Sequence, residues 1–212
     1  MAKEQKNTQR LLVEGKNDQH VVWALCNYYN VTENFDIKDC DGIGKLLDVL
    51  KVTLTNPSLY RTIGIILDAD NDIAARLDQI RTIVNPLGYM IPKSLPNTGL
   101  ICTSSDPTYP KIGVWLMPDN LNLGMVEDFA LSLAPQNDPL LAEAEAVLQR
   151  IEKAGIQKYI PNHRSKAKIH TYLAWQDEPG APIGQSITKQ VLNPNHPIAQ
   201  GFVKNWLVPL FQ

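Results

Sequence analysis

The sequence predicts an α/β protein in which a mostly parallel central sheet is sandwiched by helices. Short apolar segments rich in β-branched residues alternate three times with amphipathic helical segments in the first half of the chain. This alternation is typical of a parallel sheet with right-handed crossovers. After residue 135 the strand-like segments give way to good helix formers. We therefore expect an α/β domain over residues 1–135 and a helical extension packed on this core over residues 136–212.

The first two β/α units each begin with a short apolar segment. Residues 10–13 end at Glu14, and an apolar run over residues 21–29 follows, which predicts a strand, a tight turn and a helix. Asp18 lies where an acid can cap the start of that helix. The second unit is expected as a strand over 35–40 and a helix over 45–54.

The third unit carries the strongest strand pattern. Residues 62–67 are almost continuously apolar and β-branched, as expected of a central strand covered on both faces. A helix over 73–84 follows and ends before Pro86. The remaining elements are expected as an edge strand at 100–103, a strand at 112–117, and helices at 125–133, 140–154, 170–175 and 198–210.

Composition and charge narrow the class of protein. The chain is 44% hydrophobic and 20% charged, which is typical of soluble globular domains. Its net charge of −2 excludes a protein that coats nucleic acid by charge alone, so contacts with nucleic acid are expected to be local or metal-mediated. The three cysteines form no disulfide or zinc pattern, and no run is apolar enough for an export signal or a membrane span. We expect a cytoplasmic protein with no membrane contact.

Acidic residues follow the predicted strands. Glu14 ends the first strand, and Asp68 and Asp70 follow the third. Ligands of open α/β sheets bind at the carboxyl ends of the strands. Residues i and i+2 of a strand point to the same face about 6.5 Å apart, so Asp68 and Asp70 are expected to share one small volume, with Asp72 just beyond. Clustered carboxylates repel one another unless a cation neutralises them, and hard oxygen ligands select Mg²⁺ or Mn²⁺.

A calcium loop is the main alternative for these aspartates, because Asp68, Asp70 and Asp72 have the spacing of the first EF-hand ligands. The sixth position of such a loop is a glycine and the twelfth is a glutamate. The chain has Ile73 and Gln79 at these positions. An EF-hand is therefore excluded.

The order of these motifs resembles the Toprim domain of topoisomerases, bacterial primases, recombination-mediator proteins and OLD-family nucleases. The shared pattern is an apolar strand followed by Glu-Gly-x-x-Asp, then a strand ending in Asp-x-Asp, and it covers residues 10–134. The chain is also similar to small stand-alone Toprim-like bacterial proteins of uncharacterised function. The resemblance implies that Glu14 is a general acid/base or metal-ligating residue, and that Asp68 and Asp70 bind metal.

The resemblance also suggests candidates for a second metal site and for a phosphate-binding lysine, outside this pattern. Glu127 and Asp128 are similar to the acids that form a second metal site in OLD-type nucleases, although both also suit the first turn of a helix. Such nucleases bring a lysine to the scissile phosphate, and Lys166 and Lys168 are both candidates. They belong to a basic cluster that fits either a phosphate-facing patch or a solvated loop: Lys158, His163, Arg164, Lys166 and Lys168.

Two functions follow from the resemblance. The first is a Mg²⁺- or Mn²⁺-dependent nuclease that acts on DNA or RNA. The second is a non-catalytic, metal-binding partner of an ATPase in DNA repair or phage defence. The oligomeric state, including a homodimer, stays open. A small-molecule phosphotransferase lacks support, because the chain contains neither a GxxxxGK[ST] nor a GxGxxG loop.

Overall fold

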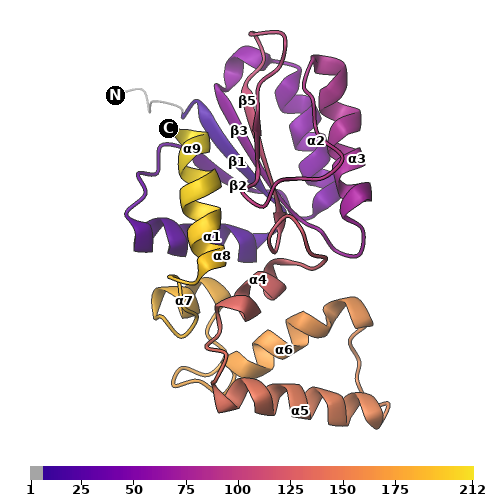
Figure 1. The fold of residues 1–212 in the computed structure, drawn as a ribbon, viewed down its shortest axis with the longest axis vertical. Coiled ribbons are helices and arrows are strands. Elements are labelled where there is room, and N and C mark those ends of the chain that lie inside the picture. Colours follow the sequence, from indigo (N-terminus) through magenta and orange to yellow (C-terminus); the bar gives the residue numbers. More distant parts are fainter. Residues whose placement is uncertain (1–6) are drawn as a thin grey trace.

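A computed structural model describes residues 7–212 of the protein and confirms the predicted fold class. A five-stranded sheet with the order β2-β1-β3-β5-β4 forms its centre (Figure 1). Strands β1, β2, β3 and β5 run parallel, and β4 is antiparallel to β5. The strands are β1 (Gln9–Val13), β2 (Asp36–Asp39), β3 (Thr62–Asp68), β4 (Leu100–Cys102) and β5 (Lys111–Met117).

The central strand β3 fixes the position of the acidic residues. Its residues are buried from Thr62 to Leu67, because β1 and β5 flank it and helices cover both of its faces. Val13 at the end of β1 pairs with Ile66. This register brings Glu14, the residue after β1, beside the carboxyl end of β3.

Helices form a layer on each side of the sheet (Figure 1). Helices α2 (Ile43–Leu54) and α3 (Ile73–Val84) pack on one face. The other face is covered by α1 (Lys16–Tyr29), the π-helix Gly201–Leu207 and α9 (Val208–Phe211). The other helices are α4 (Val126–Leu133), α5 (Pro139–Lys153), α6 (Arg164–Leu173), α7 (Ile183–Thr188) and α8 (Pro197–Gln200).

The C-terminal helix lies in close contact with the sheet. A Cβ atom on Gly113 would lie 2.4 Å from Leu210 Cδ2, so only glycine lets α9 approach β5 this closely. The side-chain amides of Gln9 and Asn34 both donate to the carbonyl of Phe211, at 3.1 and 2.9 Å. Residues 198–211 therefore complete one layer of the α/β core.

The segment after residue 135 thus has two parts. Helices α5 and α6 form a hairpin that projects from the body of the protein (Figure 1). Its base is anchored by Ile169, Tyr172 and Leu173, which belong to the core that covers the α1 face of the sheet. The rest of the segment returns to the sheet through α7, α8 and the helical turns up to α9. The structure does not test the predicted division at residue 135, which stays a prediction.

Several helix boundaries differ from the prediction. Helix α1 begins at Lys16, ahead of the apolar run, and Asp18 lies in its first turn as expected, where it accepts the backbone N–H of Gly15 at 3.0 Å. Helix α6 begins at Arg164, six residues before the expected start. The expected helix over 198–210 is a π-helix between two short α-helical turns. Within residues 7–212, no helix combines the length and apolar character that crossing a membrane requires.

Candidate functional site

A cavity of about 490 Å³ opens at the carboxyl ends of β1 and β3. Six carboxylates line it, two of them, Asp39 and Asp41, from the carboxyl end of β2, and the other four are Glu14, Asp18, Asp68 and Glu127. These four come from the end of β1, the first turn of α1, the end of β3 and the first turn of α4. The topology therefore gathers residues that are more than one hundred positions apart in the sequence.

Hydrogen bonds to backbone amides join the elements that surround this cavity. Glu14 Oε2 accepts the N–H of Asp68 at 3.3 Å, which ties the end of β1 to the end of β3. Asp68 Oδ1 accepts the N–H of Val126 at 2.9 Å, at the start of α4. A carboxylate at a helix N-terminus satisfies one of the free amides and interacts favourably with the helix dipole. Asp68 therefore fixes the position of the first turn of α4. Glu127 lies in this turn and is positioned with it.

Asp18 is the most deeply buried aspartate of the site. Its side chain is only 3% exposed, and Oδ2 accepts the N–H of Gly15. Its other oxygen, Oδ1, is buried and has no hydrogen-bond partner in the described part of the chain. A buried carboxylate oxygen without a partner is costly, so this atom points to a ligand that supplies positive charge.

The acids of the cavity raise one another's pKa values. Burial, with the charges of Asp18 and Glu14, raises the pKa of Asp68 from 3.8 to about 9. Burial and the charge of Glu14 raise the pKa of Asp18 from 3.8 to about 7. Burial is also the main cause that raises the pKa of Glu14, and the charge of Asp70 contributes to the rise. The cluster therefore resists full ionisation unless a cation compensates it.

Basic side chains lie at the rim of the same cavity. Glu127 is 3% exposed, and its Oε1 lies 3.5 Å from Lys166 Nζ and 3.4 Å from Asn17 Nδ2. Lys16 and His163 also line the cavity. An acidic floor with a basic rim suits a ligand that combines a divalent cation with an anionic group such as phosphate.

The structure distinguishes the two candidate lysines by position. Lys166 lines the cavity, whereas Lys168 Nζ lies 2.9 Å from Glu145 Oε2 on α5. Arg164 of the same basic cluster is bonded to Glu145 and Glu152, at 2.6 and 2.8 Å. Lys168 and Arg164 therefore stabilise the packing of α6 on α5, and Lys166 is the lysine that faces the acids.

Asp70 does not share a strand face with Asp68, and that expectation is wrong. Strand β3 ends at Asp68, and Asp70 has a left-handed backbone with φ of 49°. Its backbone bonds to Gly124, and its carboxylate pairs with Arg76. Because the i/i+2 rule requires a continuing strand, it fails at this turn. Asp70 influences the cavity through the pKa of Glu14 rather than by lining it.

Two more acids that the sequence suggested as metal ligands, Asp72 and Asp128, have other contacts. Asp72 caps α3 by accepting the N–H of Ala75 at 2.9 Å. Asp128 accepts the N–H of Met125 at 2.8 Å and the hydroxyl of Ser165. Neither lines the cavity. Of the two alternatives for Glu127 and Asp128, the structure places Glu127 in the cavity and gives Asp128 a capping role.

The donor chemistry of the cavity fits a hard divalent cation, because it offers carboxylate oxygens and one buried oxygen without a partner. The spacing is wider than in a compact metal site. Among the residues that the structure describes, no three His, Cys, Asp or Glu side chains are grouped closely enough to hold one metal ion. The residues that fit a cation best are Glu14, Asp18, Asp68 and Glu127.

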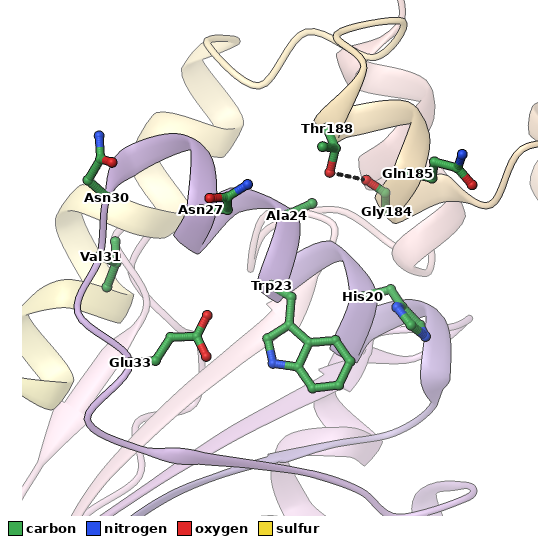
Figure 2. Close-up of a pocket in the computed structure, with 10 residues that line it drawn as sticks. All are labelled: His20, Trp23, Ala24, Asn27, Asn30, Val31, Glu33, Gly184, Gln185 and Thr188. Atoms are coloured by element: carbon green, nitrogen blue, oxygen red, sulfur yellow. Dashed lines mark hydrogen bonds between the residues drawn. The ribbon is translucent and has the colours of Figure 1, made fainter.

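A second cavity, of about 700 Å³, lies between α1 and α7 (Figure 2). His20 and Trp23 line it from α1, with their rings edge to face at 5.3 Å between centroids. Glu33 is its one acidic lining residue. This larger cavity therefore lacks a cluster of acids that could bind a metal ion.

Some lining residues were missed from the sequence. Asp39 and Asp41 follow β2 at the same edge of the sheet, so the rule that selected Glu14 and Asp68 also applied to them. Asn17 carried no comparable signal, since its place in the cavity depends on how α1 packs, whereas His163 was already part of the basic cluster expected from the sequence.

The fold and the site together define an α/β protein with an acidic cavity at the carboxyl edge of a parallel sheet. Residues 8–212 match DUF3226, a family of proteins of unknown function, and the chain belongs to this family. No curated protein and no solved structure matches the chain.

Proposed function

We propose that the protein is a Mg²⁺- or Mn²⁺-dependent nuclease of the cytoplasm that hydrolyses phosphodiester bonds in DNA or RNA. The observation that carries the proposal is the buried, unpartnered Oδ1 of Asp18 among the other acids of the cavity. The Toprim-like order of Glu14, Asp18 and Asp68 along the sequence supports it. The three cysteines are free thiols, which agrees with a reducing compartment.

Each side chain of the cavity has a role in this proposal. Glu14, Asp18, Asp68 and Glu127 would hold the cation. A bound Mg²⁺ or Mn²⁺ would activate a water and stabilise the leaving oxygen. Lys166 would bind a non-bridging phosphate oxygen, because its ammonium group lies at the rim beside Glu127. Glu14 has a raised pKa and would accept a proton from the attacking water.

Cleavage assays with purified protein test the proposal. Linear, nicked and supercoiled DNA and single-stranded RNA are incubated with Mg²⁺, with Mn²⁺ and with EDTA. We expect cleavage that needs the metal and is lost in Asp68→Ala and Asp18→Asn. Asp48→Asn, which changes an exposed acid on α2, is the control and keeps activity. Cleavage that persists in Asp68→Ala would contradict the proposal.

The wide spacing of the acids supports a second candidate function. Because no three acids of residues 7–212 group closely, the site also suits a protein that binds metal without cutting and acts with an ATPase. This candidate requires that Mn²⁺ binds, that no substrate is cleaved, and that an ATPase co-purifies with the protein from its native host. Metal-dependent cleavage by the isolated protein would exclude it.

A further inference from the structure

The α5–α6 arm, residues 139–173, carries a charge opposite to that of the whole protein. Six basic residues stand against three acidic ones in this segment, a net charge of +3, whereas the whole chain has a net charge of −2. The arm is also the part of the molecule that projects from the α/β body (Figure 1). Positive charge is therefore concentrated on the most protruding element.

Ion pairs within the arm separate its structural cations from its available ones. Arg164 and Lys168 are held by Glu145 and Glu152 on α5. These contacts lower the pKa of Glu145 from 4.5 to about 2. These ion pairs hold α6 against α5, and they neutralise the charges of Arg164 and Lys168.

The remaining cations lie along the exposed side of the arm. Arg150, Lys153 and Lys158 are exposed and form no ion pair with any described residue. Arg150 and Lys153 are three positions apart on α5 and therefore share a helix face. In the first turn of α6, next to the loop that joins it to α5, Lys166 lies at the acidic cavity and pairs with Glu127. Lys153 and Lys158 thus lie near one end of the α5–α6 loop, and the other end of this loop, at His163, lines the cavity.

The tip of the arm also exposes two large apolar side chains. Ile156 is 64% exposed and Ile160 is 55% exposed, in the loop that joins α5 to α6. Gly155, with φ of 65°, makes the turn that leads into this loop. Apolar side chains flanked by lysines at the end of a projection are the composition with which proteins enter the minor groove and press between base steps.

From these features we infer that the α5–α6 arm binds double-stranded nucleic acid. Lys153, Lys158 and Arg150 contact phosphates, and Ile156 and Ile160 press against the base pairs. The inference rests on the proposed function in one respect: the arm directs the bound strand toward Lys166 and the acids. A membrane surface fits less well, because two isoleucines bury little area in lipid.

Fluorescence anisotropy in EDTA tests this inference without cleavage. The full-length protein is titrated into a short fluorescein-labelled DNA duplex, and separately into an RNA duplex, at several salt concentrations. Two double variants change the tip: Lys153→Gln with Lys158→Gln, and Ile156→Ser with Ile160→Ser. The matched control is Lys51→Gln with Lys93→Gln, which removes two exposed charges on the α2–α3 side of the protein.

The two tip variants have different expected results. Lys153→Gln with Lys158→Gln removes two phosphate contacts. The slope of log affinity against log salt therefore becomes less negative by about 1.8, and binding weakens about tenfold at low salt. The isoleucine variant weakens binding severalfold and leaves the salt slope unchanged, since it removes no charge. The control variant binds like the wild type. Tip variants that bind like the control, or a wild type that binds no duplex, would overturn the inference.

The same proteins separate this inference from its alternatives. Wild type that binds vesicles containing anionic phospholipid, but no duplex, places the arm on a membrane and refutes the inference. Duplex binding through the arm without any metal-dependent cleavage refutes the proposed nuclease and leaves the inference standing. Cleavage that is unaffected by both tip variants, together with unchanged duplex binding, refutes the inference alone.

Discussion

Glu14 Oε2 accepts the backbone N–H of Asp68 at 3.3 Å, so one carboxylate of the cavity holds the backbone of another. The two side chains are therefore fixed near each other although both favour the charged form in water. This contact makes the properties of the cavity depend strongly on pH and on bound cations.

We expect the metal-free protein to lose stability as the pH rises from about 4 towards 9. The pKa values of Asp18 and Asp68 are raised from 3.8 to about 7 and about 9, so the folded state binds more protons than the unfolded state across this interval. Their contribution is complete below the unfolded pKa and is lost as the pH passes through the folded pKa. Urea denaturation in EDTA across this range measures it. Added Mn²⁺ is expected to restore stability at the alkaline end, and a flat profile in EDTA would contradict the prediction.

Asp18→Asn is expected to stabilise the metal-free protein above neutral pH and to weaken its affinity for Mn²⁺ at least tenfold. The amide oxygen can still cap α1 at Gly15, while the buried negative charge is removed. Removing an unpaired buried charge raises the free energy of unfolding by about 1–3 kcal/mol. Urea denaturation and Mn²⁺ titration calorimetry measure the two effects. Asp48→Asn is the control, and equal Mn²⁺ affinities for both variants would count against a cation at Asp18.

Substitutions of the two lysines of α6 are expected to have different effects, one on catalysis and the other on stability. Lys166→Ala lowers kcat for cleavage by about 10²–10³, the usual effect of removing one group that stabilises developing charge, and leaves the thermal midpoint unchanged. Lys168→Ala breaks the contact with Glu145 and costs at most about 1 kcal/mol of stability, with kcat within a few fold of wild type. Steady-state kinetics and thermal unfolding of both variants decide between them. A loss of kcat in Lys168→Ala, with unchanged kcat in Lys166→Ala, would contradict the position given to Lys166 at the cavity.

Asp70 and Arg76 are expected to shift the pH dependence of cleavage in opposite directions. The charge of Asp70 raises the pKa of Glu14 and that of Arg76 lowers it. Arg76→Gln therefore moves the acid limb of the kcat/KM profile to higher pH, and Asp70→Asn moves it to lower pH. Profiles of the two variants and the wild type provide the measurement. Shifts in the same direction would show that Glu14 does not set the acid limb.

Gly113→Ala is expected to destabilise the protein by about 1–3 kcal/mol, since its Cβ would overlap Leu210 on α9. Leu210→Ala makes room for that Cβ. The double variant is therefore expected to be more stable than the sum of the two single effects predicts, as measured by urea denaturation. Strict additivity would show that Leu210 does not cause the strain.

The sequence alone predicted the sheet and part of the site. The alternation of apolar strands and helices was sufficient for β1, β2, β3 and β5, because burial dictates both periodicities. Glu14 and Asp68 were predicted because they directly follow strands. The rule failed at Asp70, where the chain leaves the strand for a left-handed turn that bonds to Gly124.

The lysine at the rim could not be predicted, for a different reason. Lys166 and Lys168 are two positions apart on a short helix, and their sequence surroundings are alike. The position of Glu145 on α5 separates them, and this depends on how two helices pack after the chain has turned. Asp18 was recognised as a cap, but its unpartnered oxygen is visible only in three dimensions.

The bond from Gln9 to Phe211 spans 202 positions of the chain. On a ribosome that adds 5–20 residues per second, about 10–40 s pass between the appearance of β1 and that of the helix that seals its face. During this interval α1 can already pack on the face that carries Leu11 and Val13, and the area that the C-terminal helices cover stays exposed. Complete burial of this face is therefore expected to be a late step when the protein folds during its synthesis.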